Sequence, residues 1–254
     1  MSIGAIGGSN PYTNIASGQR INSAANDPSG LAIAKGMEAQ ISSSNKNVDN
    51  AATAINVAKT ADGALESVQG VLQRLKELAT KANTGTMTSD DKKIVQVEVE
   101  ALKEQISQTA ATTEFNQMKL LDGSFNNKNI ALNTEGGGSK FSIANTSLEN
   151  LGIKGFDVTK GFDLKSLDEA MNKVSQARSN VGSASNAFEF ATNSINGKIA
   201  NITSSMSKIQ DSDIAKEVTS LKKNQILEQY KLQTQRMSSN TMYQQAGMVA
   251  DFKL

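Results

Sequence analysis

The sequence contains no cysteine, no histidine and no tryptophan, and it has only two prolines in 254 residues. Without cysteine and histidine, thiol nucleophiles, Ser-His triads, zinc fingers and most transition-metal sites are excluded. No loop has the Asp/Asn/Gly spacing of a calcium site, so we expect no metal and no cofactor. The net charge of +1 gives no electrostatic reason to expect nucleic acid or a membrane as a partner.

Long apolar runs are also missing, and none approaches the roughly 20 residues of a membrane-spanning helix. Residues 1–14 are rich in Gly, Ser and Asn and lack a charged segment followed by an apolar one. We therefore expect no cleaved signal peptide. This expectation fits a cytosolic protein, and it fits equally well an export route that needs no cleaved signal.

Both prolines, Pro11 and Pro28, precede position 29, and aromatic residues make up only 4% of the chain. Helices break at proline, so the remaining sequence permits very long helices. With few aromatic residues, aliphatic side chains must fill the core, which suits slender helical bundles.

Two long stretches, 31–83 and 167–209, repeat apolar or small residues in alternating steps of three and four. This spacing places them on one stripe of a helix, and such long stripes imply packing of helix on helix. The predicted core positions are Ile41, Val48, Ile55, Leu65 and Leu72 in the first stretch and Val174, Val181, Phe188, Ile195 and Ile202 in the second.

Between these stretches the sequence predicts first a further helix and then a region with β-structure. Residues 88–91 read Thr-Ser-Asp-Asp, the N-cap and acidic first turn of a further helix that extends to about Ala111. Beyond it, residues 129–133 and 140–143 flank three glycines at 136–138 and predict a β-hairpin. A mostly irregular loop is the alternative.

The C-terminal stretch begins with Asp211 and Asp213, which we interpret as capping residues of a last helix. They could be imagined as catalytic carboxylates, but without His, Cys or a convergent pocket we expect no enzyme. From 231 to 245 the sequence is polar and a poor isolated helix, so we expect it to order against other copies. The apolar positions expected to drive this assembly are Ile214, Val218, Leu221, Ile226 and Tyr230.

Three stretches resemble bacterial flagellin. The first is residues 16–34, ASGQRINSAANDPSGLAIA. The second is LQRLKELA at 72–79, followed by TEFN at 113–116 and KLLDG at 119–123. The third is SKIQDSDIAKE at 207–217, with NQIL at 224–227. All three occur in order and are separated by helical stripes, which makes the resemblance specific.

The resemblance implies a mainly α fold, an elongated antiparallel helical bundle or coiled coil with a small β-hairpin region in the middle. It implies an N-terminal inner-layer segment with a turn motif at 1–30 and the two halves of a helical rod at 31–111 and 166–210. A short variable region with the hairpin would occupy 112–165, and a C-terminal inner-layer helix 211–254.

The function implied is that of a structural subunit of the flagellar filament, which polymerises with its own copies for motility. Type III export without a cleaved signal would secrete it to the flagellum outside the cell. A flagellar export chaperone and cap or junction proteins would be further partners.

Residues 72–79 also resemble the motif that host Toll-like receptor 5 recognises in some flagellins. The resemblance assigns a receptor or inter-subunit surface to Arg74, Glu77, Leu78 and, on the following helix, Gln105. Because Gln105 stands where an acidic residue is usual, we expect receptor activation to be reduced. The alternative is that Arg74 and Glu77 contact only the next subunit.

Two departures from the family pattern keep other functions open. Only about 16 residues precede the Ser17-Gly18 motif, so we expect a shortened N-terminal segment, and the end of the chain is less apolar than usual. The alternatives are a non-polymerising or minor flagellin paralogue, or a hook–filament junction protein, acting as an interaction module.

Overall fold

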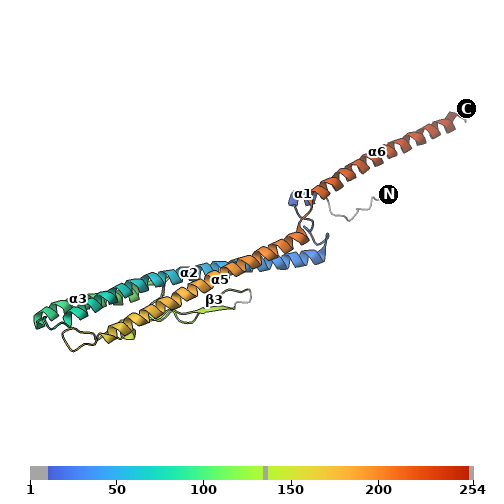
Figure 1. Ribbon diagram of the computed structural model, residues 1–254. Coiled ribbons are helices and arrows are strands. Elements are labelled where there is room, and N and C mark those ends of the chain that lie inside the picture. Colours follow the sequence, from blue (N-terminus) through green and yellow to red (C-terminus); the bar gives the residue numbers. More distant parts are fainter. Residues whose placement is uncertain (1–10, 134–136, 252–254) are drawn as a thin grey trace. The chain divides into compact units, whose positions relative to one another are not determined.

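The computed structural model describes residues 11–133 and 137–251 (Figure 1). The chain divides into two compact units. The larger unit is formed by residues 42–199, and the smaller one combines residues up to Ile41 with those from Ala200 onward. The predicted mainly α fold with a small hairpin region is confirmed, and each unit is described below by itself.

The first long stripe forms helix α2, Pro28–Ala82, and the second forms α5, Lys165–Gln210. The carboxylate of Asp27 accepts a hydrogen bond from the backbone N–H of Gly30 at 2.9 Å, so it caps the start of α2. Pro28 occupies the first helical turn, where its missing N–H costs nothing. No proline follows in the sequence, and α2 has a total length of 55 residues.

In the larger unit α2 and α5 run antiparallel, because Lys76 near the end of α2 pairs with Asp168 near the start of α5 at 2.5 Å. Further along, Arg178 of α5 donates to Asp62 at 2.9 Å. The buried stripe of α2 continues through Ala61 and Leu65, and Asp62 lies beside it, where it pairs with Arg178. Hydrogen bonding to Asp62 raises the pKa of Arg178 above its ordinary value.

Helix α3, Ser89–Thr112, packs Val95, Val99 and Ile106 into the same core. Its start is the predicted cap. The Thr88 hydroxyl accepts the backbone N–H of Asp91 at 3.2 Å, and the Asp91 carboxylate accepts that of Thr88 at 3.0 Å. This reciprocal arrangement satisfies two of the donors that a helix N-terminus leaves unpaired.

The predicted hairpin is present as β3, Lys128–Ala131, and β4, Gly138–Phe141, which pair antiparallel with Ala131 opposite Gly138. A Cβ on Gly138 would lie 1.6 Å from the carbonyl oxygen of Ile130, so only glycine fits there. A second, unpredicted hairpin joins β1, Glu114–Phe115, to β2, Met118–Lys119. Its two turn residues, Asn116 and Gln117, both have positive φ, as a type I′ turn requires.

Aromatic contacts tie the β3–β4 hairpin to α5. Phe141 meets Phe125 on one side and Phe188 of α5 on the other, both edge-to-face with ring centroids 5.5 Å apart. Phe188 is 1% exposed. A chain of three rings therefore holds the hairpin against the helical core.

The segment after the short helix α4, Leu148–Leu151, is held by polar side chains of α3. Lys103 is buried and donates to the carbonyl oxygen of Phe156 at 3.2 Å and to Glu100 at 3.1 Å. Gln96 accepts the backbone N–H of Val158 at 2.8 Å. These hydrogen bonds pair backbone polar groups of the loop, and they give the buried ammonium group of Lys103 its acceptors.

The smaller unit contains α1, Pro11–Ser17, and α6, Ile214–Asp251. Helix α1 was not predicted from the sequence, and its side chains find partners on α6. Residues 1–10 lie outside the described part. The carboxylate of Asp213 accepts the backbone N–H groups of Ala215 and Lys216, which confirms its capping role.

We predict that Phe188→Ala lowers the free energy of unfolding by about 3–5 kcal/mol, because it leaves a cavity beside Phe141. Phe190→Ala is a matched control, since Phe190 lies on the same helix but is 77% exposed. It should change stability by less than about 0.5 kcal/mol. Urea unfolding followed by circular dichroism measures both. Equal losses would show that the ring chain does not anchor the hairpin.

We predict an acid-sensitive cap at the start of α3. Hydrogen bonds from the Thr88 hydroxyl and backbone hold the pKa of Asp91 below its usual range. The stabilisation is therefore present above the unfolded pKa of about 3.9 and is lost as the pH falls through the folded value. Thr88→Val should raise the pKa of Asp91, as followed by carboxyl-carbon NMR titration. Thr86→Val, two residues before the cap, should leave it unchanged.

Candidate interaction surfaces

The predicted receptor surface centres on Arg74, whose guanidinium group joins two carboxylates. Arg74 donates to Glu98 of α3 through Nε at 3.0 Å and Nη2 at 2.8 Å, and through Nη1 to Glu77 at 3.3 Å. These bonds, the one to Glu98 above all, raise the pKa of Arg74. All three side chains are about half exposed. The cluster is an ordered, accessible ionic surface across α2 and α3.

Leu78 does not belong to this surface. Its side chain lies in the core and is only 5% exposed. Positions 74 and 78 are related by a rotation of about 40° on a helix, and the edge of the core runs between them. The long Arg74 side chain reaches past that edge to solvent, whereas the short Leu78 packs inward with Leu75 and Ala79.

Gln105 is exposed on α3, seven residues or about two turns beyond Glu98. The structure thus brings Arg74 and Glu77 together with Glu98, while Gln105 lies farther along the same helix. The ionic role of Glu98 could not be recognised from the sequence, because it depends on how α3 folds back along α2.

The predicted core positions divide into two groups. Leu65, Leu72, Val174, Val181 and Phe188 are buried in the core cluster of the larger unit. The remaining five are only partly buried: Ile41, Val48, Ile55, Ile195 and Ile202.

The predicted assembly positions lie on α6. Leu221 is partly buried, while Ile214, Val218, Ile226 and Tyr230 are exposed. From residue 222 to 241 every side chain is exposed, and the helix nevertheless continues through the polar stretch 231–245. A helix without tertiary contacts is stabilised only by its weak intrinsic propensity.

Helix α1 covers only the first part of α6. Asn14 is fully buried and donates to Glu217 at 3.1 Å, and Gln225 donates to the hydroxyl of Tyr12 at 3.1 Å. The order of these contacts shows that α1 runs antiparallel to α6. From residue 226 to 241 every side chain of α6 is exposed, and the described chain offers this part of the helix no cover.

The turn motif before α2 binds the end of α5. The backbone N–H of Arg20 donates to the carbonyl oxygen of Gln210 at 2.7 Å, and its guanidinium group donates to that of Ile209 at 2.8 Å. In the opposite direction, the backbone N–H of Ser212 donates to the carbonyl oxygen of Gly18 at 3.0 Å. The polar residues that the sequence marks as a turn therefore join the two ends of the chain.

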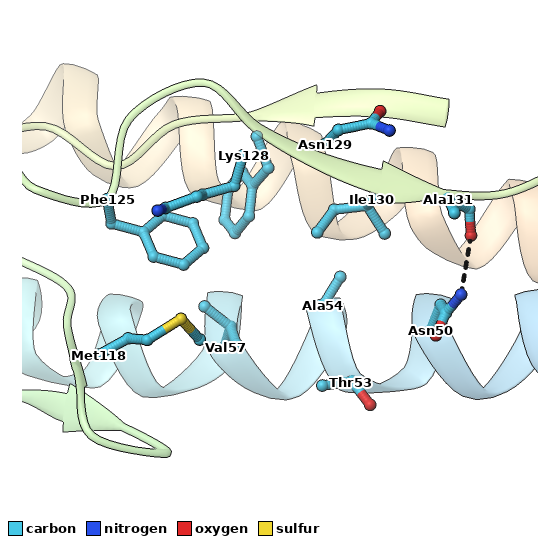
Figure 2. A pocket seen from close by; sticks show the side chains of 11 residues that line it. Asn50, Thr53, Ala54, Val57, Met118, Phe125, Lys128, Asn129, Ile130 and Ala131 are labelled. Atoms are coloured by element: carbon cyan, nitrogen blue, oxygen red, sulfur yellow. Dashed lines mark hydrogen bonds between the residues drawn. The ribbon is translucent and has the colours of Figure 1, made fainter. Parts of the chain in front are cut away.

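A groove of about 380 Å³ lies between α2 and the β3–β4 hairpin (Figure 2). Ala54 and Val57 form its floor on α2, and Ile130 and Phe125 face them from the hairpin side. Phe141 of β4 also lines the groove. The side-chain amide of Asn50 closes one end by donating to the carbonyl oxygen of Ala131 at 3.3 Å. This groove has no counterpart in the sequence-based predictions, because its walls come from segments far apart in the chain.

Among the described residues, no group of three or more acidic, histidine or cysteine side chains is arranged to hold a metal ion. Within the same residues, no helix combines the length and the apolar character that a membrane span needs. The notable surfaces are thus the ionic cluster, the exposed face of α6 and the groove.

Comparison with protein families gives two matches. Residues 7–126 match the bacterial flagellin N-terminal helical region, and residues 164–249 match the bacterial flagellin C-terminal helical region. Together they cover most of the chain and leave residues 1–6, 127–163 and 250–254 unmatched.

Individual relatives agree with these matches. The chain is 35% identical to flagellin of Bacillus subtilis (strain 168), over 85% of this chain and 84% of that protein. It is 31% identical to the flagellar filament core protein flaB2 of Brachyspira hyodysenteriae, over 91% of this chain and 88% of the relative.

Solved structures give the same fold. Flagellin of Bacillus cereus has a TM-score of 0.53 at 25% identity, covering 58% of this chain and 88% of that one. A putative flagellar hook-associated protein of Vibrio parahaemolyticus has a TM-score of 0.58 at 14% identity, covering 73% of this chain and 100% of that one. At this low identity, the match shows only that the two folds are alike. The family matches and the identity over most of the chain lead to one conclusion: this chain belongs to the bacterial flagellin family.

Proposed function

We propose that this flagellin builds the filament by coupling the packing of α6 to assembly. As a member of a structural family it is a filament subunit and not an enzyme. The observation that carries the proposal is the uncovered part of α6, where Ile226 and Tyr230 are 66% and 68% exposed. Neighbouring copies would bury these side chains and supply the tertiary contacts that the helix lacks.

The domain organisation follows from the same idea. The terminal segments 1–30 and 211–254 would form the inner layer, and 31–111 with 166–210 would form the rod around it. The short region 112–165 would project outward. The contacts of Arg20 and Gly18 with the end of α5 support a fixed junction between the terminal segments and the helices that follow.

Partners other than self are part of this proposal. The filament lies outside the cell, and type III export without a cleaved signal would deliver the subunit. An export chaperone would protect the exposed apolar side chains of α6 before assembly, and cap or junction proteins would bind the ends of the filament.

Recognition by Toll-like receptor 5 would use Arg74, Glu77 and the neighbouring Glu98. Two observations support this assignment. Each of the three side chains is about half exposed, and the guanidinium group of Arg74 is held by both carboxylates. Leu78 would contribute only by holding α2 in place. Gln105, which carries no charge, would weaken the contact.

We predict that the purified protein forms filaments when seeded with ammonium sulfate, as seen by negative-stain electron microscopy. Backbone amides of 226–241 should exchange hydrogen rapidly in dilute monomer and become protected in filaments, because only assembly buries them. Amides around Leu72 should be protected in both states. Protection of 226–241 in the monomer, or persistent monomers after seeding, would favour a non-polymerising paralogue or a junction protein.

We predict that Arg74→Ala reduces activation of Toll-like receptor 5 in a reporter-cell assay by about tenfold, as expected for loss of roughly 1.4 kcal/mol of binding. Gln105→Glu should increase activation, because it restores a negative charge. Lys35→Ala, at an exposed ion pair with Glu38 on the same helix, is the control. Unchanged potency of Arg74→Ala would leave that surface only an inter-subunit role.

A further inference from the structure

We propose that the groove between α2 and the β3–β4 hairpin receives Ile94 and Val97 of α3 from a second copy of this chain. We call these two side chains the α3 ridge. The inference rests on the proposed filament function and specifies one of the contacts through which subunits join.

The groove has the properties of a receiving site. Its walls are mainly apolar and come from α2, β3 and β4, together with Met118 of β2 and Phe125. Met118 stands at its edge and is 40% exposed, although a methionine side chain gains from burial. Figure 2 shows Ile130 directed toward Ala54 across the groove, with Met118 beside Val57. An apolar group entering here would displace water from side chains on every wall.

The α3 ridge has the complementary properties. Ile94 is 71% exposed and Val97 is 72% exposed, one helical turn apart, on a different face of α3 from the buried Val95 and Val99. Two β-branched residues contribute nothing to the core from these positions. Their stiff side chains would lose little freedom on entering a groove.

Charge fits the same pairing. Lys128 lines the groove, and among the residues that the structure describes it has no ion pair. Beside the α3 ridge, Arg74 is shared by two carboxylates, Glu77 and Glu98, so one negative charge remains uncompensated. Helix α3 as a whole carries five acidic residues against three basic ones. A basic groove edge would therefore meet an acidic flank.

The contact would also propagate. Groove and ridge are different surfaces on the same subunit, so each bound pair leaves one free groove and one free ridge. Such heterologous contacts extend into helical assemblies unless a ring closes. The main rival for the groove is Phe190, which is 77% exposed on α5 but has no second large apolar side chain exposed beside it on that helix.

Cross-linking tests the contact directly, because the natural chain has no cysteine. Val97→Cys and Thr53→Cys proteins are mixed in equal amounts, assembled into filaments and oxidised. Thr53 lines the groove on α2. We expect a covalent dimer in filaments and none in dilute monomer. Val97→Cys mixed with Ser185→Cys, on α5 away from the groove, should give none.

The outcomes separate the two proposals. Filaments in which Val97→Cys and Thr53→Cys do not cross-link, or in which Phe190→Cys reacts with Thr53→Cys instead, would overturn the groove assignment and leave the filament function intact. Failure of the natural chain to form filaments would overturn the filament function and the groove contact with it.

Charge reversal supplies a second measurement if a cysteine variant does not assemble. Lys128→Glu should raise the critical concentration for polymerisation roughly two- to fivefold, as for loss of one surface ion pair and gain of repulsion. Lys140→Glu is the matched control, on the same hairpin but outside the groove lining. Equal effects of the two reversals would contradict the proposal.

Discussion

Burial of the α2 stripe in a common core with the α5 stripe is the contact on which the larger unit depends. Ala58, Ala61 and Leu65 of α2 are nearly inaccessible, and so are Ala170, Val174 and Val181 of α5. Small alanine side chains fill many of these buried positions, so the core is packed with few aromatic residues. The hairpins, the 156–158 segment and α3 then attach to this pair through a small number of specific contacts.

The helices could be predicted because their signals are local and long. The absence of proline after position 28, the alternating spacing and the Thr88–Asp91 cap each act within a few residues. The β1–β2 hairpin escaped prediction because strands of two residues have no periodicity, and only Asn116 hinted at the turn. Helix α1 was missed because Asn14 and Tyr12 are stabilised by α6, about 200 residues away.

The candidate surfaces were predictable only in part. Helical spacing gave the exposure of Arg74 and Glu77, but it could not tell that the core edge passes between Arg74 and Leu78. The partnership with Glu98 and the walls of the groove arise when α3 and the hairpin fold back on α2. Such long-range neighbours leave no periodic trace in a single sequence. What could be predicted are the elements, and what required the structure is which of their faces meet.

The arrangement around Arg178 has a consequence for how the two long helices are aligned. Its guanidinium group binds Asp62 and Gln69 and also lies 3.5 Å from Glu66, so acceptors follow one another at single-turn intervals along α2. A displacement of α5 by one turn, about 5.4 Å, would still leave Arg178 beside an acceptor. The charges around Arg178 alone therefore tolerate neighbouring alignments. The Lys76–Asp168 ion pair and the edge-to-face contact of Phe188 with Phe141 do not tolerate them.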